Sequence, residues 1–263
     1  MAGPLLATVA AFAMSGAGPL RVRPVRVAND LTINIYELAQ PADLVNAWYG
    51  GDGRATGQDP FGVVLWPGAL FASRRLWAAR EELAGAKVLV MGAGTGLEAL
   101  TAATLGADVV AGDINRMTLE LLQDAAKDAG VGNRLQTQYL DLSGLDPLPF
   151  ADVYLFCDVF YTKELAQHVA RRCSEILGRS EGATPGRPSW LFLTDSQRFC
   201  SDAFLTELND RRHPAPAMEW QEEKLAQFTG SGILVDEDQT YDAQIAFLDL
   251  RWRDGSCVLP SYK

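Results

Sequence analysis

Four aspartates stand where predicted β-strands end, and carboxylates at such positions attract cations and accept hydrogen bonds from hydroxyl groups. The apolar runs in question finish at Asp113, Asp141, Asp158 and Asp195. Ligands of open α/β sheets bind outside the carboxyl ends of the strands, which meet at one edge. The pattern therefore predicts an acidic ligand site. Aspartate is also favoured after strands for local reasons, and for Asp195 alone this explanation is equally good.

A glycine-rich turn precedes the first of these aspartates. Residues 88–99, VLVMGAGTGLEA, form an apolar strand that ends in Gly92, Gly94 and Gly96 and continues into a helix-forming segment. Such a turn needs φ values that a Cβ disfavours, and a ligand must approach its backbone closely. Asp113 follows about 20 residues later, where a carboxylate can accept both hydroxyls of a ribose. Together these residues indicate a nucleotide-cofactor site.

The spacing of the glycines favours one class of cofactor. The dinucleotide fingerprint G-x-G-x-x-G needs its last glycine at position 97, which is Leu97, whereas the third glycine here is Gly96. The spacing G-x-G-x-G is commoner in enzymes that use S-adenosylmethionine. The alternative is a glycine-rich turn in some other α/β protein, so the remaining elements must decide.

Strands and helices alternate along the chain, which predicts an α/β fold with a doubly wound, mostly parallel sheet. Pro67 suits the first turn of a helix over GALFASRRLWAAREEL, and Gly130 suits the end of one over RMTLELLQDAAKDAG. Residues 178–188 have the composition of a loop. The other predicted strands are LQTQYLDL, VYLFCD, WLFLTD, MEWQEEKLAQF and AQIAFLDLRW, and the other helices are LEALTAATL, KELAQHVARRCSEIL and FLTELNDRR.

Length and composition limit the classes of function. The 263 residues, 48% hydrophobic, suffice for one domain or a domain with an appendage. A formal net charge of −10 argues against a nucleic-acid partner, because a phosphate backbone requires a basic face. A cationic substrate is favoured, although acidity that only maintains solubility is the alternative. No apolar run reaches about 18 residues, so no transmembrane helix and no membrane partner are expected.

The four cysteines, Cys157, Cys173, Cys200 and Cys257, are scattered without C-x-x-C spacing. We therefore expect reduced, buried thiols and no metal site.

The N-terminal segment admits two interpretations. Residues 1–20 are apolar and small, and no acidic residue precedes Asp30, as in an organelle-targeting leader. However, RVRPVRVA and LTINIYEL alternate with period 2 around Asn29 and Asp30, which predicts a β-hairpin. We expect an extension over residues 1–59, with a flexible start and this hairpin, ahead of a domain over residues 60–263. The expected location is cytoplasmic, with mitochondrial import as the alternative.

Five segments, FGVVLWPGALFASRRL, VLVMGAGTGLEA, VVAGDIN, YLDL and FCDVFY, resemble the seven-strand S-adenosylmethionine-dependent methyltransferases. Among these the chain is similar to the lysine methyltransferase-like group called methyltransferase family 16, over about residues 31–252. Within that group, WPGALFASRRL, DVFYTKELA and TDSQR look closest to the electron-transfer-flavoprotein β-subunit lysine methyltransferases. That branch tends to have Gly-Asp-Pro-Gly-Arg at the last of these positions. The resemblance implies a Rossmann-like methyltransferase sheet of seven strands.

The resemblance also implies a cofactor site for S-adenosylmethionine. Backbone amides of the turn at residues 92–96 would face the methionyl carboxylate. Asp113 would hold the ribose, Ile114 would lie under the adenine, and Asp141 would accept its amino hydrogens. Trp66 resembles a pocket wall of the family, although an ordinary aromatic residue at a helix start is an equal alternative. The implied ligands are Trp66, Gly92, Ala93, Gly94, Gly96, Asp113, Ile114, Asp141, Leu142 and Cys157, where the family often carries tryptophan at the position of Leu142.

Asp158 and Tyr161 form the D-x-x-Y signature of the group and are the implied catalytic residues. Methyl transfer needs a neutral amine lone pair within about 3 to 3.5 Å of the methyl carbon. A lysine with a pKa of about 10.4 is mostly protonated at neutral pH, and a carboxylate raises that pKa further. Asp158 is therefore expected to orient the incoming cation, not to deprotonate it. Tyr161 would offer a π face to it, whereas Phe160 is expected in the core.

One position departs from the family pattern. The family usually places Asp or Glu two residues before the first glycine, to help hold the amino group of the cofactor, and here that position is Val90. The sequence does not show that Met91 or Glu98 replaces it.

We predict an S-adenosylmethionine-dependent methyltransferase that acts on a lysine side chain of a protein. One alternative is a small-molecule N- or O-methyltransferase, because the same fold serves many acceptors. The other is a non-catalytic binding module. Acceptor choice is expected to depend on residues 1–60 and 178–188, which are the additions and loops around the core.

Overall fold

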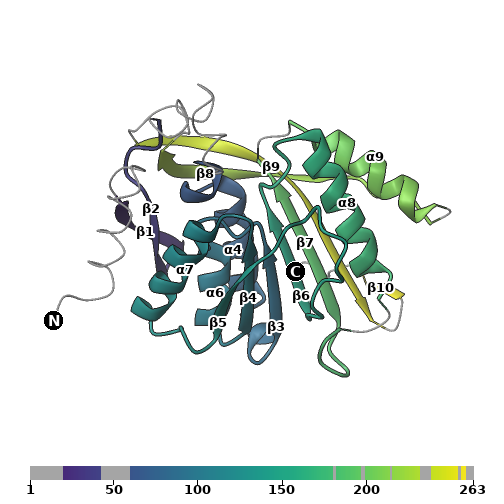
Figure 1. The fold of residues 1–263 in the computed structure, drawn as a ribbon, viewed down its shortest axis with the longest axis horizontal. Helices are drawn as coiled ribbons and strands as arrows, with labels where there is room; N and C mark the ends of the chain where they lie inside the picture. Colours follow the sequence, from purple (N-terminus) through teal and green to yellow (C-terminus); the bar gives the residue numbers. More distant parts are fainter. Residues whose placement is uncertain are drawn as a thin grey trace.

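One sheet of eight strands lies at the centre of the computed structural model, and its middle strands are short and mostly apolar (Figure 1). The structure describes residues 20–42, 60–179, 182–196, 199–213, 215–231, 238–253 and 256–258. The strands of this sheet are β3 (Lys87–Met91), β4 (Asp108–Asp113), β5 (Leu135–Tyr139), β6 (Val153–Cys157), β7 (Ser189–Asp195), β8 (Gln221–Ser231), β9 (Asp238–Arg253) and β10 (Ser256–Val258).

Their order is β10-β9-β7-β6-β3-β4-β5, with β8 paired to β9. The pairs among β3 to β7 are parallel, and β9 pairs antiparallel with β7, β8 and β10. Every residue of β6 and β7 is buried, as expected for parallel strands covered on both faces. The doubly wound, mostly parallel sheet is confirmed, and the three-residue β10 is an addition to the seven expected strands.

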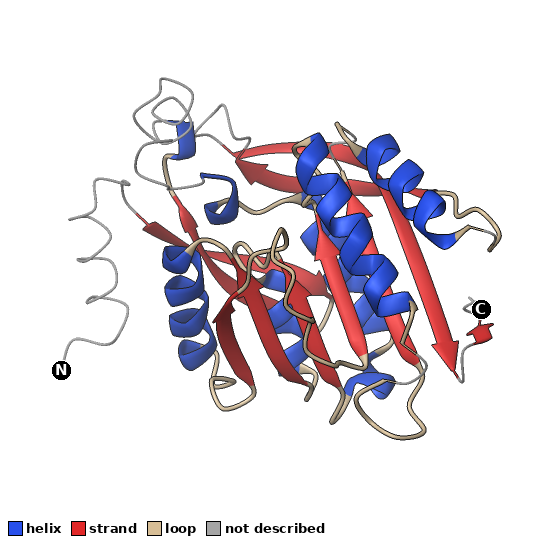
Figure 2. Ribbon diagram, turned by 45° about the vertical axis from the view of Figure 1, so that its right-hand side comes forward, coloured by secondary structure: helices blue, strands red, loops and turns tan. Residues whose placement is uncertain are grey.

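Helices cover both faces of the sheet (Figure 2). They are α4 (Pro67–Ala78), α5 (Arg80–Leu83), α6 (Leu97–Thr104), α7 (Arg116–Asp128), α8 (Lys163–Leu177) and α9 (Ser201–Arg212). Side chains alternate between the faces along each strand. Val88 and Val90 therefore belong to the core with α4, α6 and α7, whereas Leu89 and Met91 belong to the core with α8 and α9. Within the described ranges, no helix is long and apolar enough to cross a membrane.

Several element boundaries differ from the sequence prediction. The single helix expected over residues 68–83 is divided at Ala79 into α4 and α5. The guanidinium of Arg80 donates to the carbonyl oxygen of Trp77 at 3.2 Å and lies over its ring, so it caps the end of α4. The third strand, β5, ends at Tyr139, so that Asp141 lies in the following loop and not at the strand end.

The predicted hairpin is present. It consists of β1 (Leu20–Ala28) and β2 (Leu31–Leu38), paired antiparallel, and it packs on α4, α6 and α7. Glu37 of β2 is fully buried and accepts hydrogen bonds from Arg21, at 2.7 Å from Nε, and from Arg23. Both arginines also pair with Asp238 at the start of β9. These pairs fix the hairpin to the ribbon of β8 and β9. The segment over residues 1–20, for which a flexible start was expected and a leader was the alternative, lies outside the described residues, apart from Leu20.

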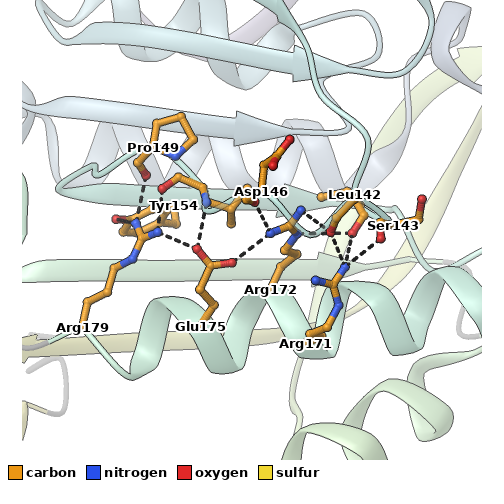
Figure 3. Close-up of polar contacts among 11 residues, drawn as sticks. Leu142, Ser143, Asp146, Pro149, Tyr154, Arg171, Arg172, Glu175 and Arg179 are labelled. Carbon is orange, nitrogen blue, oxygen red and sulfur yellow. Dashed lines mark hydrogen bonds and ion pairs between the residues drawn. The ribbon is translucent and has the colours of Figure 1, made fainter.

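Arginines of α8 hold the loop between β5 and β6, which carries Asp141 and Leu142 (Figure 3). Arg172 donates to the carbonyl oxygens of Gly144 and Asp146 at 2.6 and 2.7 Å. Arg171 donates to the carbonyl oxygen of Leu142 at 2.9 Å. The loop has no regular backbone pairing of its own, so the side chains of α8 satisfy its carbonyl groups.

Replacing Arg172 by methionine is expected to lower the free energy of unfolding by about 3 kcal/mol, because buried carbonyl groups and Glu175 lose a charged donor. Urea titration followed by circular dichroism measures this. Lys127→Met is the control, since the Lys127 side chain is 52% exposed and its surface ion pair contributes less than about 1 kcal/mol. A loss below about 1 kcal/mol in Arg172→Met would contradict the role of this side chain in holding the loop.

The segment at residues 182–188 lies at the opposite edge of the sheet from the strand carboxyl ends. The amide of Thr184 donates to Asp152, just before β6, at 2.8 Å. Arg187 donates to the carbonyl oxygen of Ala84, just before β3, at 3.0 Å. The expectation that residues 178–188 select the acceptor is therefore wrong, because a loop between a helix and the following strand returns to the edge where strands begin.

Candidate functional site

A cavity at the carboxyl ends of β3, β4 and β6 brings together nearly all the predicted site residues. Those that line it are Trp66, Gly92, Ala93, Gly94, Asp113, Ile114, Asp141, Leu142, Cys157, Asp158 and Tyr161. Gly96 and Asp195 do not line it. Residues from five different chain segments therefore meet at the edge where the topology of a doubly wound sheet places a ligand site.

The glycine turn forms the floor of this cavity. Gly92 has φ +69°, and a Cβ there would lie 2.5 Å from Cγ1 of Val159. The amides of Gly92 and Ala93 both donate to the carbonyl oxygen of Gly112, at 2.9 and 3.0 Å, and the amide of Gly94 donates to Asp113 at 2.9 Å. These amides are therefore engaged within the protein, and the glycines shape the cavity instead of offering open donors.

Gly96 has a different function from the one expected. It adopts φ +71° as the residue before α6, and a Cβ on it would overlap the side chain of Leu122 in α7. The third glycine thus permits two helices to pack closely. Unlike Gly92 and Gly94, it does not line the cavity.

Asp113 and Ile114 combine a buried carboxylate with an uncovered apolar surface. Asp113 is 7% exposed, and its oxygens accept hydrogen bonds from the amides of Gly94 and Asn115, both at 2.9 Å. Ile114 is 50% exposed although it is a large aliphatic residue. Such a pair can hold a ligand that carries hydroxyl groups beside a flat ring.

Asp141 and Leu142 close the side of the cavity next to β5. The carboxylate of Asp141 accepts a hydrogen bond from the amide of Ser143 at 2.8 Å, and hydrogen bonding with Ser143 lowers the pKa of this carboxyl below its usual value. Leu142 is buried, and its carbonyl oxygen is held by Arg171. The carboxylate of Asp141 is therefore ionised and faces the cavity from a fixed loop.

Asp158 joins three elements at the centre of the site. It follows β6 with φ +55°, a strained value for a residue with a side chain. Its Oδ2 accepts from the amide of Gly68 in the first turn of α4 at 2.7 Å, and its Oδ1 accepts from the amide of Ser196 after β7 at 2.5 Å. Burial, together with the nearby charge of Asp195, raises the pKa of Asp158 to about 7, although these hydrogen bonds oppose the shift.

Aromatic side chains form the outer wall. Tyr161 is 38% exposed and stacks on Phe61, with ring centroids 5.1 Å apart. The ring of Trp66 lies 6.4 Å from that of Phe61, centroid to centroid, and its Nε1 donates to the carbonyl oxygen of Phe61 at 2.9 Å. Trp66 is thus both the residue before α4 and part of the cavity wall. Phe160 is 2% exposed and packs on Phe204, so its expected place in the core is confirmed.

Sequence reasoning missed the segment before α4. The 3-10 helix η1 (Pro60–Val63) places Phe61 and Gly62 in the cavity, and the carbonyl oxygen of Gly62 lies 3.3 Å from the Cβ position of Gly94. This segment therefore covers the glycine turn. The sequence feature that could have indicated this segment is the pair of aromatic residues in FGVVLW, Phe61 and Trp66. The other lining residues not predicted are Val64, Ala69, Thr95, Glu98, Asn115, Leu140, Val159 and Leu165.

The lining carries one sign of charge. Glu98, Asp113, Asp141 and Asp158 contribute four carboxyl groups, and the described lining includes no lysine or arginine. Glu98 is 1% exposed, and its Oε2 has no hydrogen-bond partner among the described residues. An acidic cavity with a buried, unpartnered carboxyl oxygen fits a cationic ligand. S-Adenosylmethionine matches this requirement, because it carries a sulfonium and an ammonium group beside a nucleoside.

Comparison with known proteins agrees with this geometry. Residues 89–178 match the family model described as methyltransferase domain. Histone-arginine methyltransferase METTL23 of Xenopus laevis is 32% identical over 107 residues, which are 38% of this chain and 45% of that protein. The Homo sapiens protein of the same name is 30% identical over 108 residues, which are 39% of this chain and 56% of that protein. The chain thus spans about half the length of these curated relatives.

Among solved structures, magnesium protoporphyrin IX methyltransferase of Synechocystis PCC 6803 with bound S-adenosylmethionine is 17% identical. The similarity covers 81% of this chain and 97% of that chain, with a TM-score of 0.43. The matched family model includes the glycine turn, Asp113, Asp141 and Asp158, which are the residues that build the cavity. Residues 89–178 are therefore similar to a methyltransferase domain, and the similar segment contains the residues that build the cavity.

Proposed function

We propose that this protein transfers a methyl group from S-adenosylmethionine to a lysine side chain of a protein. The observation that carries the proposal is the position of Asp158 and Tyr161, which lie in one acidic cavity with the glycine turn. The proposed division of the chain is an extension over residues 1–59 and a methyltransferase domain over residues 60–263. The proposed location is cytoplasmic, with mitochondrial import as the alternative.

The inner half of the cavity is the proposed cofactor site. Asp113 would accept the ribose hydroxyls, and the exposed face of Ile114 would pack on the adenine. Asp141 would accept the amino hydrogens of the base beside the amide of Leu142, in the loop that α8 holds in place. Trp66 and Cys157 would enclose the methionyl part. When bound, the cofactor supplies a methyl group on a positively charged sulfur.

The outer half of the cavity is the proposed acceptor site. Phe61 and Tyr161 present stacked rings whose π faces attract a cation and exclude water. Removing a lysine amine from water lowers its pKa and favours the neutral form that carries the lone pair. Asp158, anchored by the amides of Gly68 and Ser196, would hold the amine in line with the methyl carbon.

An arginine side chain is the second candidate acceptor, because the curated relatives are named histone-arginine methyltransferases. A guanidinium pairs most strongly with a carboxylate whose two oxygens both face its planar fork. Both oxygens of Asp158 already accept backbone amides, from Gly68 and Ser196. This arrangement favours the single point charge of a lysine over a bidentate guanidinium.

Transfer of labelled methyl groups to a whole-cell protein extract tests the proposal. The extract is incubated with the full chain and methyl-tritiated S-adenosylmethionine, and the labelled protein is hydrolysed and separated by chromatography. Methyllysine is the expected product, whereas methylarginine would establish the second candidate. Label confined to small molecules would show a small-molecule methyltransferase. If there is no transfer and calorimetry shows no binding at millimolar cofactor, the protein is not a methyltransferase but a binding module.

A further inference from the structure

In the methyltransferases that this chain resembles, the strand residue two positions before the first glycine usually supplies a carboxylate to the cofactor. Val90 occupies this position here, and the neighbouring strand residues supply no carboxylate. Val90 is fully buried in the core between the sheet and the layer of α4, α6 and α7. Met91 points to the opposite core, with α8 and α9. Neither residue lines the cavity. A ligand ammonium group therefore receives no carboxylate from β3.

A carboxylate reaches the same region from the facing helix instead. Glu98 is the second residue of α6, it is 1% exposed, and it lines the cavity. The helix packs on the sheet face that carries Val90 and Cys157. The carboxyl of Glu98 interacts with the thiol of Cys157, the last residue of β6. The side chain of Glu98 thus projects toward the sheet face that also carries the side chain of Val90.

In the absence of a ligand, this side chain lies in an unfavourable environment. Its Oε2 has no hydrogen-bond partner in the part of the chain that the structure describes. Burial raises the pKa of Glu98 to about 8, and its own backbone amide and the Cys157 thiol offset only part of this shift. The other titratable groups that act on it, Asp158 and Asp113, are carboxylates and raise the pKa further. A bound cation is the partner that this arrangement lacks.

We infer that Glu98 binds the ammonium group of S-adenosylmethionine and so replaces the carboxylate that the family usually carries at the position of Val90. This inference rests on the proposed cofactor site. It adds a ligand that the sequence pattern does not indicate, because the carboxylate comes from a helix and not from a strand. Through this contact, Glu98 would favour ligands that carry the amino-acid part of the cofactor over ligands that lack it.

Comparing the binding of two nucleosides, one with and one without the amino-acid group, measures this contact independently of the rest of the site. S-Adenosylhomocysteine carries the ammonium group, whereas 5′-methylthioadenosine has the same nucleoside and sulfur without the amino acid. In Glu98→Gln, which keeps the shape of the side chain, we expect the Kd of S-adenosylhomocysteine to rise by about 30-fold. The Kd of methylthioadenosine should change by less than about twofold. Isothermal titration calorimetry on the full chain measures both, and Glu120→Gln, an exposed carboxylate on α7, is the control.

Proton release gives a second readout. The pKa of Glu98 in the free protein is raised to about 8, so the carboxyl is mostly protonated at pH 7, and pairing with a cation lowers that pKa. Binding of S-adenosylhomocysteine at pH 7 should therefore release about one more proton from the wild type than from Glu98→Gln. Calorimetry in buffers of different ionisation enthalpy counts these protons. Titration of the ligand itself is common to both proteins and cancels in the difference.

The outcomes distinguish this inference from the proposed function. Glu98→Gln should fold with a Tm at pH 9 equal to or above that of the wild type, because it removes a buried charge. Unchanged binding of S-adenosylhomocysteine by the folded variant, or equal losses for both nucleosides, would overturn the inference and leave the cofactor site intact. Failure of the wild type to bind either nucleoside or S-adenosylmethionine would overturn the inference and the proposed function together.

Discussion

Asp158→Ala is expected to lower kcat/KM for methyl transfer by at least about 1,000-fold, while the Kd of S-adenosylmethionine changes by less than about threefold. The carboxylate lines the cavity, in the half proposed to bind the acceptor, and is held by the amides of Gly68 and Ser196. Its removal leaves the amine without an orienting partner, whereas the ligands of ribose and adenine are untouched. A filter assay with labelled cofactor measures the first quantity, and calorimetry measures the second.

Two control variants distinguish a loss of orientation of the acceptor amine from a loss of protein stability. Asp158→Ala also leaves two backbone donors without an acceptor, which costs about 2 kcal/mol of unfolding free energy. Asn209→Ala removes two hydrogen bonds to Met218, far from the lining, and should lose similar stability while remaining active. Asp158→Asn keeps the shape but places an amide donor against one of those backbone amides. An active Asp158→Ala protein would show that the acceptor binds elsewhere.

The pKa of Asp158 predicts a pH dependence for the wild type. Burial raises this pKa to about 7, so the carboxylate is ionised above pH 7 and protonated below it. Activity should therefore fall as the pH is lowered through 7, because a protonated carboxyl attracts the acceptor cation less. Deprotonation of the lysine acts in the same direction at higher pH. In Asp158→Asn the step near pH 7 should be absent from the pH profile of the residual rate.

Gly96→Ala is expected to lower the free energy of unfolding by about 4 kcal/mol, because the new methyl group must overlap Leu122. Gly130→Ala is a matched comparison. Gly130 has φ +74° against +71° for Gly96, but nothing lies within 4 Å of its Cβ position. That substitution tests the cost of the backbone conformation alone, about 1 to 2 kcal/mol. Urea titration of both variants measures the difference, and equal losses would show that α6 and α7 adjust without cost.

The sequence predicted the order of the central elements well because β3, β4, β6 and β7 are short and mostly apolar, and helices follow β3, β4 and β6. The apolar run that ends at Cys157 and the helix that follows from Lys163 both lie where the pattern placed them. Boundaries that depend on a single side chain were not predictable. The division at Ala79 follows from the capping contact of Arg80 with Trp77, which composition does not encode.

The candidate site was predictable where strand ends determine position, as for Asp113 and Asp158. It was not predictable where two distant segments meet. Phe61 enters the cavity because η1 folds over the glycine turn, which is a tertiary contact. The proposed role of Glu98 was hidden for a similar reason, since only the packing of α6 against the sheet shows that its side chain faces Cys157 and not solvent.

The ion pairs of the N-terminal hairpin bear on how the chain folds during synthesis. Arg21 pairs with Asp238, a residue 217 positions later in the chain. This contact cannot form until Asp238 has left the ribosome, and a contact of such long range also forms late in a refolding molecule. The pairs of Arg21 and Arg23 with Glu37 lie within the hairpin and can form earlier. The hairpin is therefore synthesised long before β9 and gains its ion pairs with the sheet only once the start of β9 is available.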